Sequence, residues 1–282
     1  MIKDEVKVIA VDLDGTLLDN QGNIQELTKK ALLQLQERGI KVVMASGRPI
    51  NGMLKYARQL RLENYGGVIV SYNGAVAYDM NEDRKLFETP IDKELVAEVL
   101  QSLEGREIYP MVEDGEYMLV ENVYEGVVDT GKSFRGIINV IEYEARGGGY
   151  LLKECRSLKD SVDFNVNKIL TIVDSNRIDK VIDEYKLKFE NSLHVVQTSP
   201  FFMEFMSLGV NKAYGLKRLG IEANTLMAFG DSMNDLEMIQ YAKYAIVMGN
   251  GQVAVKNEAD YVTLDCNNEG IYHALKHFEL ID

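Results

Sequence analysis

The sequence of 282 residues has few cysteines and no long apolar run, and each shortage excludes a class of protein. Two cysteines, Cys155 and Cys266, are too few for a disulfide framework, and no C-x-x-C pair occurs. We therefore expect a reducing compartment, the cytoplasm. No stretch approaches the ~18 uninterrupted apolar residues of a membrane span. Charged side chains also interrupt the first seven residues, so we expect neither a membrane span nor a signal peptide.

Positive charge is also scarce. The chain has 31 Lys and Arg against 44 Asp and Glu, which gives a formal net charge of −13 at pH 7. Such a balance repels nucleic acid and anionic membranes, so we expect neither as a partner. Any role in handling phosphate would need positive charge gathered locally. The length and the 46% share of hydrophobic residues indicate an ordinary globular protein of about two domains.

Short apolar runs alternate with helical periodicity at both ends of the chain. The pattern predicts strands at 6–11, 40–45, 68–71, 226–230, 245–248 and 261–264, and helices at 24–38, 52–62, 212–219, 235–242 and 270–278. Strands that alternate with helices form a parallel sheet with helices on both faces. The predicted fold class is therefore α/β, with a Rossmann-like parallel-sheet core.

The middle of the chain has a different pattern, in which strands follow one another through hairpin-like turns. Helices are predicted at 93–103, after a capping Asp92, and in a segment that Ser175 would cap; strands are predicted at 107–113, 116–121, 168–174, 194–198 and 202–207. The three glycines at 147–149 indicate a mobile loop. We expect residues 86–207 to form an inserted α+β cap domain, within a core made of 1–85 and 208–282.

Four polar clusters lie at the predicted strand ends and helix starts. They are Asp12 with Asp14, Ser46 with Arg48, Lys212, and Asp231 with Asn234 and Asp235. In an open parallel sheet, ligands bind outside the carboxyl ends of the strands. The clusters come from distant parts of the sequence, but this topology would place them along one edge of one sheet.

Asp12 and Asp14 follow a buried strand directly, and two carboxylates so close together repel one another unless they share a cation or a proton. Mg²⁺, a hard cation that prefers oxygen ligands, would relieve the repulsion. One Asp could then attack an electrophile while the other transfers a proton. Asp231 could complete a metal shell with Asp12. The alternatives are an acidic turn at Asp14-Gly15, a capping acid at Asp231, and a favourable helix-dipole position for Asp235.

The remaining polar residues suit an anion. Ser46 and Gly47 form a strand–helix turn whose hydroxyl and N–H groups could hold phosphate, and Lys212 offers a point charge. The alternatives are an ordinary helix start and a surface lysine. Asn73 belongs to an Asn-Gly pair between two apolar runs, which favours a hairpin turn, although Asn73 could still reach the site.

Together these residues resemble the ordered motifs of the haloacid dehalogenase superfamily, and most closely its Cof-type phosphatases. The matching segments are Val-Asp-Leu-Asp-Gly-Thr-Leu at 11–17, Ser-Gly-Arg-Pro at 46–49, Asn-Gly-Ala at 73–75, Asn-Lys at 211–212, Gly-Asp-Ser-Met-Asn-Asp at 230–235 and Met-Gly-Asn at 248–250. The resemblance covers the expected core, whereas the insert matches only in length, position and helix–strand alternation. Tyr72 stands where Asn is common in that group.

The resemblance implies roles for these residues. Asp12 would be the nucleophile, Asp14 the general acid and base. Mg²⁺ would be held by Asp12, the Asp14 carbonyl and Asp231, with Asp235 completing or orienting the shell. Three residues, Ser46, Lys212 and Asn234, would bind phosphate, and Gly47, Arg48 and Asn73 are candidate substrate contacts.

The resemblance further implies a phosphatase of a small phosphorylated metabolite, with a sugar phosphate favoured and the insert acting as a lid. A phosphosugar mutase or phosphotransferase stays open as an alternative, as does a phospho-accepting signalling module. We expect a monomer or a small homo-oligomer.

Overall fold

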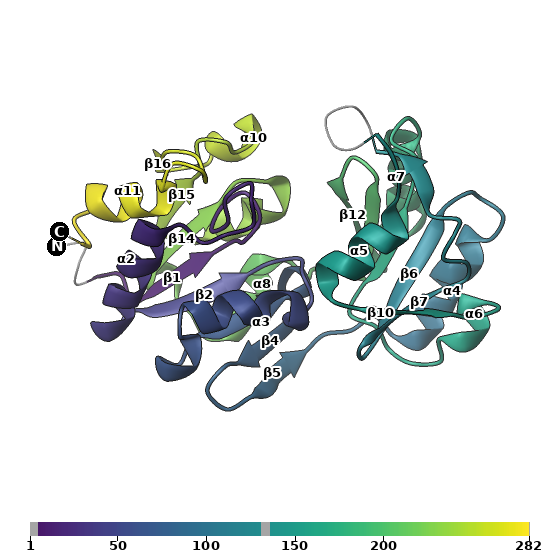
Figure 1. The fold of residues 1–282 in the computed structure, drawn as a ribbon, viewed down its shortest axis with the longest axis horizontal. Coiled ribbons are helices and arrows are strands. Elements are labelled where there is room, and N and C mark those ends of the chain that lie inside the picture. Colours follow the sequence, from purple (N-terminus) through teal and green to yellow (C-terminus); the bar gives the residue numbers. More distant parts are fainter. Residues whose placement is uncertain (1–4, 131–135, 282) are drawn as a thin grey trace. The chain divides into compact units, whose positions relative to one another are not determined.

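The computed structural model describes residues 5–130 and 136–281. The chain divides into two compact units, one formed by Met1–Glu88 with Asn211–Asp282 (unit 1) and the other by Thr89–Val210 (unit 2). The chain passes between the units at 88/89 and 210/211, three residues beyond the boundaries that the sequence predicts on each side. Figure 1 shows both units and labels many of their elements.

Unit 1 is built on an eight-stranded sheet in the order β16-β15-β14-β1-β2-β3-β4-β5. Its strands are β1 Val8–Val11, β2 Lys41–Ala45, β3 Val68–Ser71, β4 Val76–Asp79, β5 Arg84–Glu88, β14 Leu226–Gly230, β15 Tyr244–Val247 and β16 Tyr261–Val262. The strands from β16 to β3 pair in parallel, and β4 and β5 add an antiparallel edge. The predicted parallel-sheet core is therefore confirmed. The strand order reverses at β1 and β14, which is where ligands bind in such sheets.

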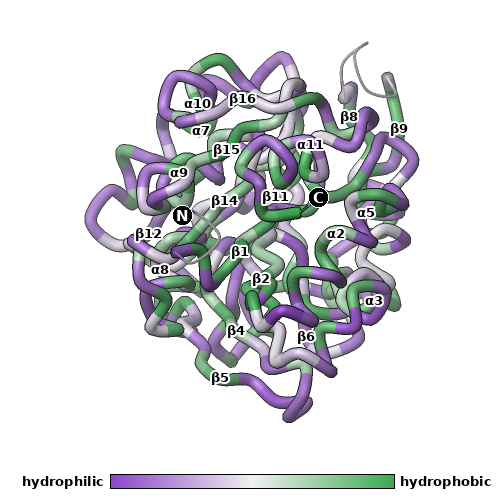
Figure 2. Tube along the Cα trace, turned by 90° about the vertical axis from the view of Figure 1, so that its left-hand side faces the viewer, coloured by the Kyte–Doolittle hydropathy of each residue, from purple (hydrophilic) through white to green (hydrophobic). Residues whose placement is uncertain are grey.

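Helices cover both faces of this sheet because its strands are apolar on both sides. Along β1, Ile9 and Val11 belong to one buried cluster, whereas Val8 and Ala10 belong to another. The first cluster includes side chains of α2 (Glu26–Glu37), α3 (Ile50–Gln59) and α11 (Gly270–His277), and the second those of α8 (Lys212–Arg218), α9 (Leu236–Tyr241) and α10 (Val253–Lys256). Each large side chain so buried stabilises the fold by roughly 1.5–3 kcal/mol. Figure 2 shows β1 and β14 as hydrophobic segments in the interior.

The N-terminus of α2 is capped by a residue from the other end of the chain. Gln25, which precedes the helix, makes no side-chain capping bond, and Glu269 accepts hydrogen bonds from the backbone N–H groups of Leu27 (2.9 Å) and Thr28 (2.8 Å) instead. A carboxylate at this position also interacts favourably with the helix dipole. This contact anchors the segment before α11 against the N-terminal part of unit 1.

The predicted hairpin at the Asn-Gly pair is present, with a connection longer than a two-residue loop. β3 and β4 pair antiparallel, with Ser71 opposite Val76, and the 3-10 turn η2 (Tyr72–Gly74) joins them. Tyr72 and Asn73 take left-handed backbone conformations, and Gly74 has φ 106°. A Cβ on Gly74 would lie 2.0 Å from the carbonyl oxygen of Asn211. The turn therefore presses directly against the start of α8, where Lys212 lies.

Unit 2 contains a six-stranded sheet in the order β10-β7-β6-β11-β13-β12 and a separate pair of strands, β8 and β9. Its strands are β6 Tyr109–Asp114, β7 Tyr117–Val120, β8 Val127–Asp129, β9 Ile137–Asn139, β10 Leu151–Glu154, β11 Ile169–Ile172, β12 Leu193–Ser199 and β13 Phe202–Ser207, and its helices are α4 Lys93–Leu103, α5 Val140–Gly148, α6 Leu158–Ser161 and α7 Ile178–Lys188. Most of these strands pair antiparallel, while β7 and β10 run parallel, and with the helices they give the predicted α+β character. Two buried clusters form the interior of this unit.

Three local predictions in unit 2 are wrong. The glycines at 147–149 do not form a mobile loop: they end helix α5, and Gly149 provides the left-handed position that commonly terminates a helix. Ser175 does not cap α7, which begins at Ile178 after Arg177. Asp92 precedes α4, but the first helical N–H donates to Asn165 Oδ1 at 2.9 Å instead. These contacts depend on packing that local sequence patterns do not show.

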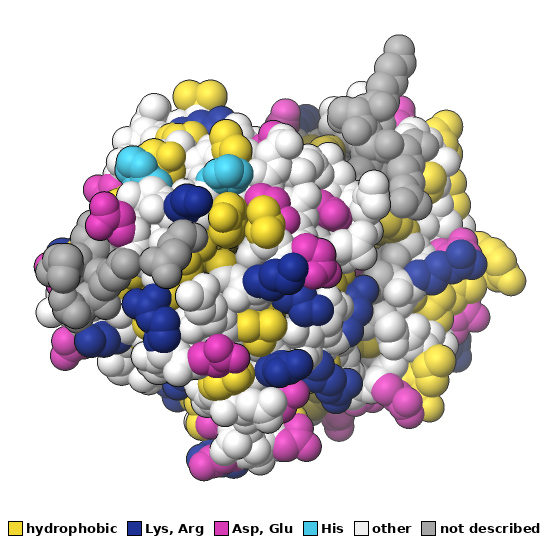
Figure 3. Space-filling view, turned by 60° about the vertical axis from the view of Figure 1, so that its left-hand side comes forward, with side chains coloured by type: hydrophobic (Ala, Val, Ile, Leu, Met, Phe, Trp, Pro, Cys, Tyr) yellow, Lys and Arg dark blue, Asp and Glu magenta, His cyan; other side chains and the backbone are white. Residues whose placement is uncertain are grey.

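The surface carries both signs of charge. On the face drawn in Figure 3, acidic and basic side chains are interspersed among small apolar areas. Within residues 5–130 and 136–281, every helix is too short or too polar to cross a membrane.

The close approach at Gly74 yields a test of the fold. The substitution Gly74→Ala should lower the free energy of unfolding by about 3 kcal/mol or more, because a backbone shift adds to the cost of a left-handed alanine. Gly39→Ala is the matched control, since Gly39 also has a positive φ (85°) but a Cβ there meets no heavy atom within 4 Å. It should cost only about 1–2 kcal/mol in urea unfolding. Equal losses would contradict the proposed packing of the turn on α8.

Candidate active site

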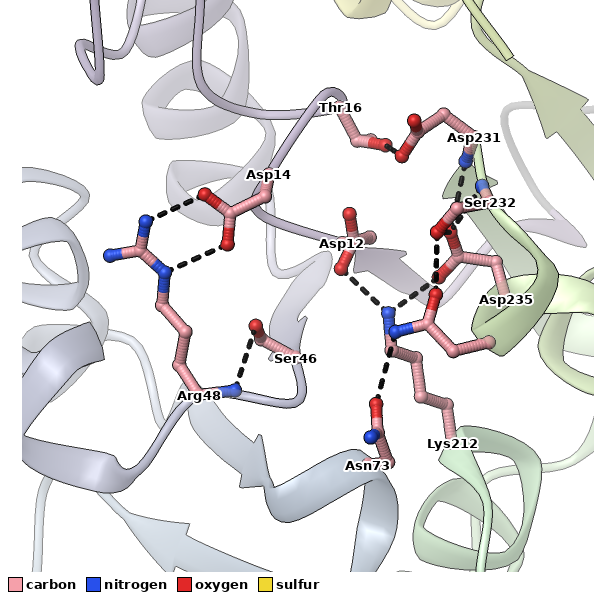
Figure 4. A network of polar contacts seen from close by, with 11 residues as sticks. Asp12, Asp14, Thr16, Ser46, Arg48, Asn73, Lys212, Asp231, Ser232 and Asp235 are labelled. Atoms are coloured by element: carbon pink, nitrogen blue, oxygen red, sulfur yellow. Dashed lines mark hydrogen bonds and ion pairs between the residues drawn. The ribbon is translucent and has the colours of Figure 1, made fainter. Parts of the chain in front are cut away.

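The polar clusters of the sequence meet at the carboxyl ends of β1, β2 and β14 (Figure 4). Asp12 follows β1, Ser46 follows β2 and Asp231 follows β14, while Lys212 is the first residue of α8. Asp235 ends a short 3-10 helix after β14 and is fully buried. The convergence arises from the topology, because parallel strands all end at the same edge of the sheet.

A buried lysine lies at the centre of this group. Lys212 Nζ donates to Asp12 Oδ1 and to Asp235 Oδ1, each at 2.6 Å. The exposed fractions are 0% for Lys212, 4% for Asp12 and 0% for Asp235. Charges removed from water in this way are tolerated only when they are paired and hydrogen-bonded, so each member depends on the other two.

The carboxylates outnumber the ammonium group, and the pKa values of Asp12 and Asp231 are raised. Burial, and then repulsion by Asp235, raise the pKa of Asp12 well above its usual value although Lys212 opposes them. Burial and the charge of Asp235 raise the pKa of Asp231 to about 7. Burial alone would lower the pKa of Lys212, but Asp12 and Asp235 outweigh it and raise that pKa, so the ammonium stays charged. The site therefore has negative charge that another cation would stabilise.

The spacing of the carboxylates fits a divalent cation. Asp12, Asp231 and Asp235 each offer a carboxylate oxygen, and these oxygens lie within 4.8 Å of one another. Hard divalent cations prefer such all-oxygen sites. Asp235 already accepts from Lys212 with Oδ1, and from the backbone N–H groups of Asp231 (2.9 Å) and Ser232 (3.0 Å) with Oδ2. It is thus better placed to orient the loop than to act as a direct ligand.

Asp14 faces away from this buried group and toward Arg48. The guanidinium donates to both carboxylate oxygens, from Nε at 2.7 Å and from NH2 at 2.6 Å. The Asp14 side chain is 58% exposed, so this ion pair is worth only about 0–1 kcal/mol. The arrangement keeps a carboxylate at the open side of the site without fixing it there strongly.

The anion-binding candidates line the other side of the site. Ser46 Oγ accepts from the backbone N–H of Arg48 at 3.2 Å. Asn73 is buried, and its Oδ1 accepts from Asn234 Nδ2 at 3.1 Å, so the turn residue also belongs to the site. A Cβ on Gly47 would lie 3.0 Å from Asn73 Nδ2, which explains the glycine there.

Two further side chains support the site, and the sequence predicted a role for neither of them. Thr16 Oγ1 donates to Asp231 Oδ1 at 3.1 Å, and Asn250 Nδ2 donates to the Gly15 carbonyl at 2.8 Å. Both lie in motifs that carry the family resemblance. Their partners are 215 and 235 residues away along the chain, so only the fold could identify these contacts.

Comparisons with known proteins give consistent matches along the chain. A profile described as haloacid dehalogenase-like hydrolase matches residues 9–275. A 5-amino-6-(5-phospho-D-ribitylamino)uracil phosphatase of Bacillus subtilis is 28% identical, over 98% of this chain and 97% of that protein. A second Bacillus subtilis protein, named as a phosphatase, is 28% identical over 96% and 99%. A solved haloacid dehalogenase-like hydrolase from Bacteroides thetaiotaomicron has a TM-score of 0.83 at 28% identity, covering 97% and 99%.

The buried lysine gives a second testable prediction. Lys212→Met should reduce the free energy of unfolding by about 3–5 kcal/mol, because it leaves two buried carboxylates without their cation. Lys217→Met is the control: Lys217 lies on the same helix but is exposed over the Tyr241 ring, so its loss should cost less than about 1 kcal/mol. Urea unfolding of both variants measures the difference. A Lys212→Met protein as stable as its control would show that the ion pairs contribute little.

Proposed function

The chain belongs to the haloacid dehalogenase-like hydrolases and is a phosphatase of that family, and from this premise we propose that it uses Mg²⁺ and an aspartyl-phosphate intermediate to hydrolyse small phosphate monoesters. The observation that carries the proposal is the buried Lys212 between Asp12 and Asp235, with Asp231 beside them at the strand ends. Sugar phosphates and similar metabolites are the proposed substrates. The relative named for a phosphorylated ribityl compound supports a substrate of this kind.

Mg²⁺ would be held by Asp12, the Asp14 carbonyl and Asp231, with Asp235 orienting the loop that carries Asp231. The oxygen donors and the excess negative charge described above support this choice. When bound, the ion would balance charge on the carboxylates and on the transferred phosphoryl group.

In the first half of the reaction, an Asp12 carboxylate oxygen attacks phosphorus while the bond from phosphorus to the ester oxygen breaks. Asp14, once protonated, gives its proton to that leaving oxygen. Lys212 would stabilise charge on a phosphoryl oxygen in the transition state, and its distance of 2.6 Å from Asp12 Oδ1 supports this role. Ser46 and Asn234 would hold the other phosphoryl oxygens.

In the second half, water attacks phosphorus, Asp14 takes a proton from that water, and inorganic phosphate leaves a free Asp12. Both roles require Asp14 to turn from Arg48 toward the reacting group. The exposed ion pair with Arg48 is weak enough to allow this. Arg48, with Gly47 and Asn73, would then be available to the substrate.

Unit 2 is proposed as the lid that selects the substrate and excludes water during the reaction. Hinges are expected at 83–90 and 205–210, around the points where the chain passes between the units. The insert predicted from the sequence, residues 86–207, also accounts for most of the negative charge, since it holds 13 Lys and Arg against 23 Asp and Glu. A substrate with a single phosphate fits this charge better than a polyphosphate.

The nucleophile is tested directly by Asp12→Asn. We expect this variant to lose phosphatase activity by at least about 10³-fold, because a neutral amide cannot attack phosphorus. Wild type and variant are assayed on a panel of phosphate esters with and without Mg²⁺, and circular dichroism checks that the variant is folded. Near wild-type activity in a folded Asp12→Asn protein would overturn the mechanism. If wild type hydrolysed the esters as fast in EDTA as in Mg²⁺, the mechanism would not involve a metal ion.

The role of Asp14 predicts a trapped intermediate. Asp14→Asn should accept a phosphoryl group from p-nitrophenyl phosphate, whose leaving group needs little acid assistance, and then hydrolyse it slowly. Intact-protein mass spectrometry should detect one added phosphoryl group in this variant, absent from the double variant with Asp12→Asn.

In wild type, steady phosphate release without transfer to a second alcohol would separate a phosphatase from a mutase or phosphotransferase. A wild-type protein that stays phosphorylated for a long time and does not turn over the ester would favour the signalling module and contradict the proposal.

A further inference from the structure

The loop after β15 wraps around Asp231. The backbone N–H of Gln252 donates to the Asp231 carbonyl at 2.8 Å, and that of Gly251 donates to the Met248 carbonyl at 2.8 Å. A Cβ on Gly251 would lie 2.9 Å from the Met248 oxygen and 3.2 Å from the Asp231 oxygen. The loop is therefore closed tightly against the backbone of Asp231, and Asn250 lies within it.

Asn250 bridges three separate segments with one side-chain amide. Its Nδ2 donates to the Gly15 carbonyl at 2.8 Å and lies 3.5 Å from Asp231 Oδ2. Its Oδ1 accepts from the backbone N–H of Cys266 at 2.9 Å. A donor and an acceptor on one planar group are both needed here, which only an amide side chain of this length supplies.

The segment that Asn250 holds on one side is the turn after the nucleophile strand, and this turn contacts Asp231 closely. Gly15 has φ 79°, and a Cβ there would lie 2.6 Å from Asp231 Oδ2. The next residue, Thr16, donates to Asp231 Oδ1 at 3.1 Å. The position of Asp231 relative to Asp12 therefore depends on how the turn and the β15 loop are held together.

We propose that Asn250 is a positioning residue of the phosphatase reaction, which holds Asp231 and the 14–16 turn at the spacing needed to bind one divalent cation. The inference rests on the proposed function, because it assigns Asp12, the Asp14 carbonyl and Asp231 to that cation. Groups that orient metal ligands typically change metal affinity by about 10- to 100-fold when they are removed. Lys212 and Ser46 lie on the phosphate side, so phosphate binding should depend less on Asn250.

The joined segments have other attachments, so losing this amide should leave the fold intact. Gly249 N–H donates to the Leu264 carbonyl at 3.0 Å, and Asn20 N–H donates to Asn267 Oδ1 at 2.9 Å. Glu269 additionally caps α2. Asn267 is therefore a matched control: it is an exposed asparagine next to Cys266, and its side-chain oxygen accepts from the backbone N–H of Asn20.

The test compares Mn²⁺ binding by wild type, Asn250→Ala and Asn267→Ala, measured by electron paramagnetic resonance of free Mn²⁺ below all three unfolding temperatures. Asn250→Ala should raise the dissociation constant about tenfold or more, and Asn267→Ala should leave it unchanged. The Mg²⁺ concentration for half-maximal rate should rise in parallel, while KM for the ester at saturating Mg²⁺ stays at the wild-type value. If Asn250→Ala is too unstable, Asn250→Ser serves in its place.

Unchanged Mn²⁺ affinity in Asn250→Ala, or an equal loss in Asn267→Ala, would overturn the role of Asn250. A rise in KM for the ester without loss of metal affinity would also overturn it. These outcomes are separate from the proposed function, which depends on ester hydrolysis by wild type. A wild type that binds Mn²⁺ but hydrolyses no phosphate ester would contradict the phosphatase mechanism. Weaker Mn²⁺ binding in Asn250→Ala would in that case still support the positioning role.

Discussion

The rest of the site depends on the burial of Lys212 between Asp12 and Asp235. A lysine in the first turn of a helix is unfavourable with respect to the helix dipole, and a lysine fully removed from water is more so. Two ion pairs at 2.6 Å compensate both effects. This pairing also constrains the backbone. Helix α8 must start where Asn211 contacts the turn at Gly74, and the ends of β1 and β14 must lie close to the one ammonium group of Lys212. A chain with a net charge of −13 thereby holds one buried positive charge beside Asp12, where the proposed reaction would use it.

Charge also explains why the site is built from several loops. Asp12, Asp231 and Asp235 repel one another, and each is held by its own set of donors. Asp12 accepts from Lys212, Asp231 from Thr16, and Asp235 from Lys212 and two backbone N–H groups. Holding like charges together in this way costs stability, which is typical of functional sites. Asp14 is itself exposed and is held less strongly, by the half-buried Arg48. The strongly held acids suit binding a cation, and the loosely held acid suits proton transfer.

Much of the fold could be predicted from the sequence because both faces of the central strands are covered. β1 and β14 are continuous apolar runs, as is β2 after Lys41, and each is followed at once by a polar residue. Their positions and the common edge of the site therefore follow from local pattern and topology. Asn73 was expected as a turn residue, and it is one, but the fold also turns it toward Asn234. Contacts between distant parts of the sequence, such as Glu269 with α2 and Asn250 with Gly15, could not be predicted. Nothing in the local sequence distinguishes these side chains from solvated ones. Helix α5 was missed because its glycine-rich end resembles a loop.

The central claim is that Asp12, supported by Lys212, carries the phosphoryl group during the reaction. A crystal structure with Mg²⁺ and beryllium trifluoride, which mimics a phosphoryl group on a carboxylate, tests it most directly. The account predicts the beryllium on an Asp12 oxygen, with Lys212 Nζ moved from that carboxylate to hydrogen-bond a fluorine, and the ion between Asp12 and Asp231. Beryllium trifluoride bound to another carboxylate would contradict the account. Beryllium trifluoride on Asp12 would also contradict it if Lys212 Nζ still contacted the Asp12 carboxylate and no fluorine.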